Sequence, residues 1–229
     1  MFGRRLLVPL GIALFLASSG LSTATAAPAA DNARARFVSS LDHAQSAKFA
    51  QLSQAQQNEA VAVFSDPLVL TGALTAAQVS RQYPGAAVTD STAGSRAALP
   101  APSAGTASMP LVVTPSTIYS VHWYYSHTVT FLWFSNTARL DYYYYTNAST
   151  VTSDQRCTWT DSGVSVNDID NLQVDHWVSS GYGYCYATVQ ISASFWVSAG
   201  VSGHGYVYQD MKVNGSTGAI WTYFHEVAP

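Results

Sequence analysis

Residues 139–147, RLDYYYYTN, contain four consecutive tyrosines. In a β-strand, successive side chains point to opposite faces of the sheet, so residues two apart share a face. One face of this segment would carry Leu140, Tyr142 and Tyr144. The other face would carry Arg139, Asp141, Tyr143 and Tyr145. Because charged side chains favour water, we predict that Tyr142 and Tyr144 lie in a core and that Tyr143 and Tyr145 face outward.

The same alternation predicts further outward rings on other segments. If Cys185 and Ala187 point inward, their neighbours point outward, namely Tyr182, Tyr184 and Tyr186. In the segment 116–127, one face is apolar and consists of Tyr119, Val121, Trp123 and Tyr125. His122 and Tyr124 lie on the opposite face. Rings that project from a sheet can stack on the C–H faces of sugars, while nearby charged groups bind hydroxyls. The candidate ligand-binding residues are therefore Tyr124, Arg139, Asp141, Tyr143, Tyr145, Tyr182, Tyr184 and Tyr186.

These rings have an alternative interpretation that needs no ligand. Aromatic side chains on neighbouring strands pack against one another and stabilise a sheet by roughly 0.5–1 kcal/mol per pair. A second sheet or a helical segment could also cover them. The parity of the rings alone does not separate these two interpretations.

Residues 118–229 have the composition of a β domain. Tyr, Trp, Val, Thr and Ser occur in short runs broken by Gly, Asn and Asp, which is typical of strands and turns. We predict strands near residues 119–126, 129–135, 138–146, 155–160, 172–178, 183–191, 193–198, 205–213 and 218–226. Asn214-Gly215 is a strong hairpin signal between the last two. Hairpins with no helix between them predict an antiparallel β-sandwich or a barrel-like fold.

Cys157 and Cys185 are the only cysteines. An even number of cysteines in an exported protein predicts a disulfide. Closing this loop would stabilise the fold by roughly 3.6 kcal/mol in the chain-entropy account.

Two segments of different character precede the β domain. Residues 27–84 contain three capping-box signals, Asp42 with Gln45, Ser53 with Gln56 and Thr75 with Gln78, which predict short helices. So short a helical segment has a marginal core of its own, and we expect it to be either a prosegment or an arm that packs on the β domain. Residues 85–117 are rich in Ala, Ser, Thr, Pro and Gly, and their composition predicts a flexible linker.

The N-terminus has the organisation of a secretory signal peptide. Arg4 and Arg5 precede an apolar run over residues 6–16, and Ala24-Thr25-Ala26 supplies the small residues that signal peptidase requires. We therefore expect cleavage after about Ala26 and a secreted mature chain. The apolar run is shorter than the ~20 residues that span a bilayer.

The remaining composition argues against several functional classes. Charged residues make up 10% of the chain and the formal net charge is −3, so the chain lacks the basic clusters of nucleic-acid-binding proteins. The histidines are scattered without ligand spacing, and we predict no metal site and no cofactor. Only Glu59 and Glu226 are glutamates, and no catalytic motif occurs, so we assign no catalytic residue.

Three functional hypotheses fit these observations. The first is a non-catalytic binding module for carbohydrate or a cell-envelope polymer. The second is a secreted hydrolase whose helical segment is a prosegment removed by cleavage in the linker. The third is a bacteriocin-like or surface-structural protein. The order of signal, helices, linker and Tyr/Trp-rich β domain resembles that of secreted proteins from high-GC Gram-positive bacteria. The oligomeric state is left open.

Overall fold

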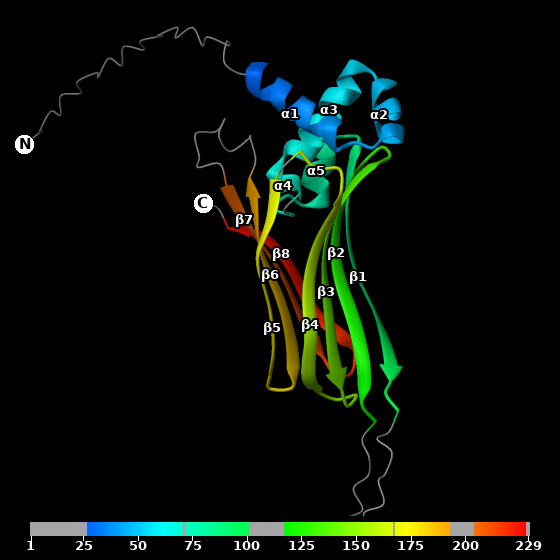
Figure 1. Ribbon diagram of the computed structural model, residues 1–229, viewed down its shortest axis with the longest axis vertical. Coiled ribbons are helices and arrows are strands. Elements are labelled where there is room, and N and C mark those ends of the chain that lie inside the picture. Colours follow the sequence, from blue (N-terminus) through cyan, green and yellow to red (C-terminus); the bar gives the residue numbers. More distant parts are fainter. Residues whose placement is uncertain (1–26, 71, 101–116, 167, 193–203, 228–229) are drawn as a thin grey trace, which may run out of the picture.

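A computed structural model describes residues 27–70, 72–100, 117–166, 168–192 and 204–227, and Figure 1 shows helices gathered at one end of two long antiparallel sheets. The helices are α1 Ala27–Ser40, α2 His43–Ala50, α3 Gln54–Ser65, α4 Pro67–Leu70 and α5 Ala76–Gln82. The strands of the first sheet are β1 Ala86–Ala98, β2 Tyr119–Phe131, β3 Phe134–Thr146 and β4 Val151–Gly163. Those of the second are β5 Asp168–Ser179, β6 Tyr182–Ser192, β7 His204–Asn214 and β8 Gly218–Val227.

Both sheets are simple meanders, with strand orders β1-β2-β3-β4 and β5-β6-β7-β8. Every neighbouring pair within a sheet is antiparallel. The predicted mainly-β, antiparallel sandwich-like fold is thereby confirmed. The hairpin at Asn214-Gly215 is confirmed as well, because Asn214 pairs with Gly218 where β7 turns into β8.

The three predicted helix caps are present. Asp42, Ser53 and Thr75 each accept a hydrogen bond from the backbone N–H three residues ahead, and Gln45, Gln56 and Gln78 return the contact. These reciprocal bonds satisfy backbone N–H groups that a helix start would otherwise leave unpaired. Helices α1 and α4 carry no such signal in the sequence and were not predicted.

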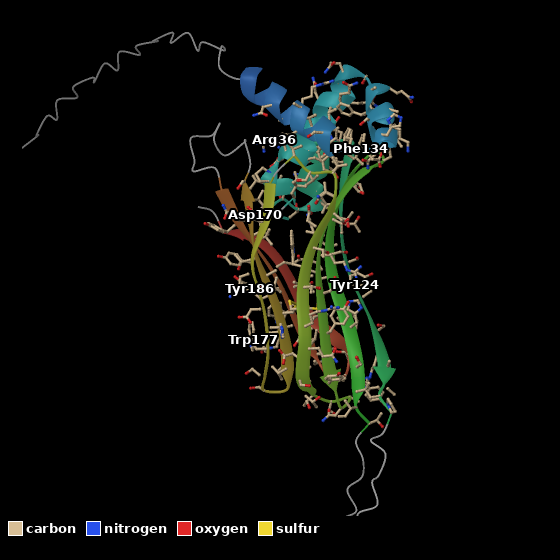
Figure 2. All side chains as sticks on the ribbon, viewed as in Figure 1. Arg36, Tyr124, Phe134, Asp170, Trp177 and Tyr186 are labelled. Carbon is tan, nitrogen blue, oxygen red and sulfur yellow. A yellow bond between two sulfur atoms is a disulfide. The ribbon has the colours of Figure 1, made fainter. Side chains whose placement is uncertain are left out.

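The helices do not form an independent bundle. Phe37 packs against Phe49 and Phe64, with ring centroids 5.1 and 5.8 Å away, and against Phe134 of β3 at 5.6 Å. Phe131, Phe134 and Val129 from the β2–β3 hairpin complete this core. The expectation that the helical segment leans on another part of the chain is therefore correct, and Figure 2 shows Phe134 at this junction.

A buried histidine also fastens the helices to the first sheet. The His127 ring is bonded through Nδ1 to Asp90 of β1 at 2.8 Å and through Nε2 to the Val69 carbonyl of α4 at 3.1 Å. The hydrogen bond to His127 is the main reason that the pKa of Asp90 lies below its ordinary value, against the opposing effect of burial. One side chain thus links β1, β2 and α4.

The second core lies between the two sheets. Its fully buried members include Leu140, Tyr142, Ala187, Val213 and Met211. Buried Gln209 of β7 accepts a hydrogen bond from Trp159 Nε1 at 2.8 Å and donates to the Tyr125 carbonyl at 3.2 Å, which ties the second sheet to the first. The predicted Cys157–Cys185 disulfide is confirmed and joins β4 to β6 across the same interface.

The first half of the predicted linker is a strand. Residues 86–98 form β1 and pair with β2 along the entire strand, from Ala86 opposite Phe131 to Ala98 opposite Tyr119. Composition missed it because β1 contributes little to a core and is held mainly by backbone pairing. Side-chain contacts add to this, since Ser91 bonds Ser126 at 2.8 Å and Gly94 leaves room for the Trp123 ring, which a Cβ there would approach to 2.4 Å. Residues 101–116 of the predicted linker lie outside the described residues.

Two other strand predictions need correction. The expected break between strands 119–126 and 129–135 is absent, because β2 continues to Phe131. The expected strand 129–135 instead contains the end of β2, a turn at Leu132 and Trp133, and the first residues of β3. His127 is buried, and the ladder continues through it. The expected strand at 193–198 lies outside the described residues, and the other expected strands all fall within β3 to β8.

Candidate functional site

The tyrosine run is divided between core and surface as its alternation predicts. Tyr142 and Tyr144 are 0% and 1% exposed, and their ring centroids lie 5.2 Å apart between the sheets. Burial is the main reason that the pKa of each phenol is raised above its ordinary value. Tyr143 and Tyr145 point outward and are half-buried. Half of the run therefore builds the sandwich, and the other half lies on the outer face of the first sheet.

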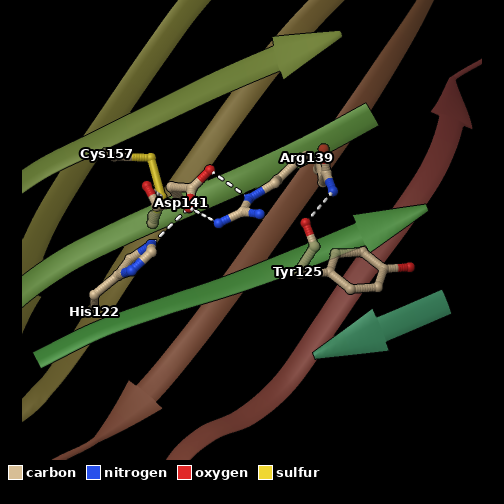
Figure 3. A network of polar contacts seen from close by, with 7 residues as sticks. His122, Tyr125, Arg139, Asp141 and Cys157 are labelled. Atoms are coloured by element: carbon tan, nitrogen blue, oxygen red, sulfur yellow. Dashed lines mark hydrogen bonds and ion pairs between the residues drawn. A yellow bond between two sulfur atoms is a disulfide. The ribbon is translucent and has the colours of Figure 1, made fainter. Parts of the chain in front are cut away.

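On that outer face, Asp141 is buried, although the sequence predicted a solvated position. Figure 3 shows the reason: Arg139 donates to both carboxylate oxygens, at 2.9 and 2.7 Å, and the His122 ring is bonded to Oδ1 through Nε2 at 2.6 Å. Burial opposes ionisation of Asp141, but the hydrogen bonds from Arg139 and His122 outweigh it and hold the pKa of this carboxyl below its ordinary value. The Asp141 carboxylate is therefore held by hydrogen bonds within the protein, and we interpret its contacts with Arg139 and His122 as structural.

Neighbouring side chains on this face pack against two of the outward tyrosines, Tyr143 and Tyr124. The His122 ring stacks on Tyr143, with 4.2 Å between centroids and planes 3° apart, and the Arg156 guanidinium lies 4.3 Å from the Tyr143 centroid. Because His122 reaches from β2 and Arg156 from β4, the ring of Tyr143 on β3 is flanked from both sides. Arg139 lies 3.8 Å from the ring of Tyr124. A sugar could stack on these rings only by displacing protein groups.

The outer face of the second sheet is more open. We call it the aromatic face; its described side chains include Trp177, Tyr182, Tyr184, Tyr186, Tyr206, Tyr208, Asp210, Lys212 and Trp221. Figure 2 shows Trp177 and Tyr186 on this side of the molecule and Tyr124 on the first sheet. Trp177 is 45% exposed and Trp221 is 42% exposed, although both are large apolar side chains.

One row of the aromatic face crosses all four strands. Trp177 on β5 is opposite Tyr184 on β6, Tyr184 is opposite Lys212 on β7, and Lys212 is opposite Trp221 on β8. Directly opposed residues of antiparallel strands share a face, so these four side chains project together. Trp177 and Tyr184 stack with planes 6° apart. The Lys212 ammonium lies 5.4 Å from the Tyr184 centroid and 4.3 Å from that of Tyr182.

A second row lies beside the first. Tyr186 and Tyr208 stack with 5.6 Å between centroids, and Thr188 donates a hydrogen bond to the Tyr186 hydroxyl at 2.8 Å. Asp210, opposite Tyr186, has one buried carboxylate oxygen with no hydrogen-bond partner among the described residues. Burial raises the pKa of Asp210 to about 6. The row therefore combines stacked rings with an acid that titrates near neutral pH.

The residues singled out from the sequence do not form one site. Tyr124, Arg139, Asp141, Tyr143 and Tyr145 lie on the first sheet, whereas Tyr182, Tyr184 and Tyr186 lie on the outer face of the second. Sequence reasoning missed Trp177, Lys212 and Trp221. Alternation in VDHWVSS would have placed Trp177 outward, but finding Trp221 opposite Lys212 requires the β7–β8 register, which includes an irregularity next to Lys212.

Within the part of the chain that the structure describes, no cluster of three or more His, Cys, Asp or Glu side chains could hold a metal ion. In the same residues, no helix has the length and apolarity needed to span a membrane. The chain matches no known protein family, and neither the curated proteins nor the solved structures contain a match.

Proposed function

We propose that this chain is a secreted, non-catalytic binding module for carbohydrate or a cell-envelope polymer, and that it binds through the aromatic face. The observation that supports this most is the row with an exposed tryptophan at each end, Trp177 and Trp221, and with Tyr184 and Lys212 between them. Exposing two indole rings to water costs free energy that a folded protein recovers only when something covers them.

The dimensions and chemistry of the row suit a short stretch of a sugar polymer. Three inter-strand spacings separate β5 from β8, which gives a row about 14 Å long. Indole and phenol rings offer flat apolar surface for sugar C–H groups, and they retain polar edges that bond to hydroxyls. Lys212 adds a hydrogen-bond donor in the middle of the row. A non-catalytic role fits this arrangement, since binding by stacking needs neither a nucleophile nor an acid–base pair.

The contrast between the two sheets decides which tyrosines we assign to the site. Tyr143 and Tyr124 are already covered by His122, Arg156 and Arg139, and their interactions are satisfied within the protein. Tyr182 and Tyr184 have Lys212 beside them, but they border exposed Trp177 and Trp221. We therefore place binding on Tyr182, Tyr184 and the two tryptophans, and we assign Tyr143 to packing.

A depletion assay tests this proposal. The purified mature chain is mixed with insoluble chitin, cellulose, xylan and peptidoglycan, and the protein left in solution is measured. We expect one of these polymers to deplete the wild type, and the Trp177→Ala Trp221→Ala variant to lose at least about tenfold in affinity, because tryptophans carry much of the binding energy in aromatic contacts.

Trp133→Ala is the matched control for this variant. Trp133 is 49% exposed and lies at the β2–β3 turn, away from the aromatic face. Its removal should leave depletion unchanged. Equal loss in both variants would indicate nonspecific adsorption by exposed tryptophan and would contradict the proposal.

A further inference from the structure

A cleft opens at the end of the sandwich that is remote from the helices. It lies where three turns meet, between β3 and β4, between β5 and β6, and between β7 and β8, and its volume is about 490 Å³. That volume lies within the ~300–1,000 Å³ typical of small-molecule sites. The side chains that define it are Ser149, Thr150, Ser180, Tyr182, Thr217 and Ile220.

Hydrogen bonds connect the three turns, so the cleft is already formed without a ligand. The Val151 N–H of β4 donates to the Gly181 carbonyl at 2.9 Å, and the Thr146 hydroxyl donates to the Gly215 carbonyl at 2.9 Å. Within the last turn, Asn214 Oδ1 accepts from the backbone N–H groups of residues 216–218 at 2.7–3.1 Å. A preorganised site loses little conformational entropy on binding.

The chemistry of the cleft is polar and uncharged. None of its lining residues carries a formal charge at neutral pH. The hydroxyls of Ser149, Ser180 and Tyr182 have no hydrogen-bond partner among the described residues, so all three are available to a ligand. Ile220, which is 46% exposed, contributes an apolar wall. Several hydroxyls, one aromatic ring and one apolar wall match a sugar with free hydroxyl groups better than they match an anion, which would call for a cationic lining.

Tyr182 connects the cleft to the aromatic face. It lines the cleft, and the Lys212 ammonium lies 4.3 Å from its ring while also lying 5.4 Å from that of Tyr184. A polymer lying on the row of Trp177 and Tyr184 therefore has the cleft directly beside it. On β8, Ile220 lines the cleft and the next residue, Trp221, belongs to the aromatic face, so the cleft and the face also adjoin there.

We infer that this cleft is a second subsite, which binds a neutral, hydroxyl-rich sugar unit adjoining the polymer segment held on the aromatic face. The inference rests on the proposed function and adds the ligand class to it. The aromatic row supplies stacking energy along the chain, and the cleft selects an uncharged unit by hydrogen bonding.

Two variants probe the cleft without touching the row. Ser149→Trp fills the cleft with a large side chain. Ser149 is exposed and its hydroxyl has no partner among the described residues, so the substitution breaks no side-chain hydrogen bond. The backbone N–H of residue 149 can still donate to Asn147 Oδ1. Ser180→Gly removes one hydroxyl at a φ of +51°, which glycine adopts without strain. Ser162→Trp is the matched control, an exposed serine near the opposite end of β4.

The test measures binding isotherms on chitin, cellulose and xylan, and on acidic pectate as an anionic probe. We expect Ser149→Trp to weaken binding to a neutral polymer about tenfold and Ser180→Gly to weaken it severalfold, as the loss of one or two hydrogen bonds implies. Ser162→Trp should match the wild type. Circular dichroism and thermal unfolding check that each variant is folded. If Ser149→Trp does not fold, the binding of Ser180→Gly alone decides the test.

The outcomes separate the two proposals. If the tryptophan variant loses binding while both cleft variants bind like the wild type, the cleft is not a subsite and the aromatic face still stands. If pectate is the polymer bound best and the cleft variants weaken its binding, the assignment to a neutral sugar is wrong. If the wild type binds none of these polymers and also fails to bind peptidoglycan, both proposals fail.

Discussion

Trp177 and Tyr184 lie face to face on neighbouring strands, with ring centroids 5.1 Å apart and planes inclined by 6°. The pair stands on the outer face of the second sheet, where Trp177 remains 45% exposed. On the first sheet the comparable stack, His122 on Tyr143, is flanked on its other side by Arg156. Both sheets thus carry a stacked cross-strand pair of rings. The pair on the first sheet is covered by Arg156, whereas the pair on the second sheet leaves the Trp177 indole exposed.

The four tyrosines of residues 142–145 should differ sharply in their effect on stability. Tyr142→Ala removes a fully buried ring from between the sheets and should lower the free energy of unfolding by about 3–5 kcal/mol. Tyr143→Ala removes a half-buried ring and should cost about 1 kcal/mol through lost stacking. Urea denaturation of the two variants checks the difference. Equal costs would mean that the inward and outward assignment of this strand is incorrect.

Asp161 should make the protein less stable as the pH rises. Burial raises the pKa of this carboxyl to about 6, against the opposing effect of the hydrogen bond from Asn136. Because the folded-state pKa lies above the unfolded value of about 3.9, the favourable contribution is complete below that value and is lost as the pH passes through about 6. Asp161→Asn should therefore stabilise the protein by up to about 3 kcal/mol at pH 7.5.

The same substitution should give no gain at pH 4, where Asp161 is largely protonated in the folded protein. Thermal unfolding at both pH values provides the measurement. A stabilisation of equal size at pH 4 and pH 7.5 would show that the carboxyl does not titrate as its burial implies.

Removing the helical segment should destabilise the β domain. Phe131 and Phe134 of the β2–β3 hairpin are 1% and 0% exposed because the helices cover them, and His127 bonds the Val69 carbonyl of α4. A chain that begins at residue 85 should therefore bind a hydrophobic dye and aggregate. If this shortened chain stayed monomeric and as heat-stable as a chain that begins at Ala27, the helices would be dispensable, as the prosegment hypothesis requires.

Loss of the disulfide should weaken the contact between the sheets. The Cys157→Ser Cys185→Ser variant opens the cross-link between β4 and β6 and should lose roughly 3–4 kcal/mol of unfolding free energy, as expected for a loop of this length. Denaturant titration of this variant, beside the reduced wild type, measures the loss. A cost near zero in both would show that core packing alone sets the stability of the sandwich.

Local signals explain what could be predicted from the sequence. The pairs Asp42–Gln45 and Thr75–Gln78 define helix starts because capping chemistry acts within a few residues. Alternation separates Tyr142 from Tyr143 because the period of a strand is fixed by backbone geometry. Asn214-Gly215 marks its hairpin because few residue pairs tolerate such a turn.

What the sequence did not reveal depends on partners that are distant in the chain. Strand β1 has only one aliphatic side chain larger than alanine, Val88, and its strand character comes from pairing with β2. The burial of Asp141 depends on Arg139 and on His122 from another strand. The accessibility of Trp177, compared with Tyr143, depends on which side chains the neighbouring strands supply. Register and cross-strand contacts of this kind have no local signature.

The most direct test of the central claim is the depletion assay with three proteins, the wild type, Trp177→Ala Trp221→Ala and Trp133→Ala, on chitin, cellulose, xylan and peptidoglycan. The account predicts that a polymer removes the wild type and Trp133→Ala from solution to the same extent and leaves the double variant behind. Retention of the double variant on that polymer, with an affinity equal to that of the wild type, would contradict binding through the aromatic face.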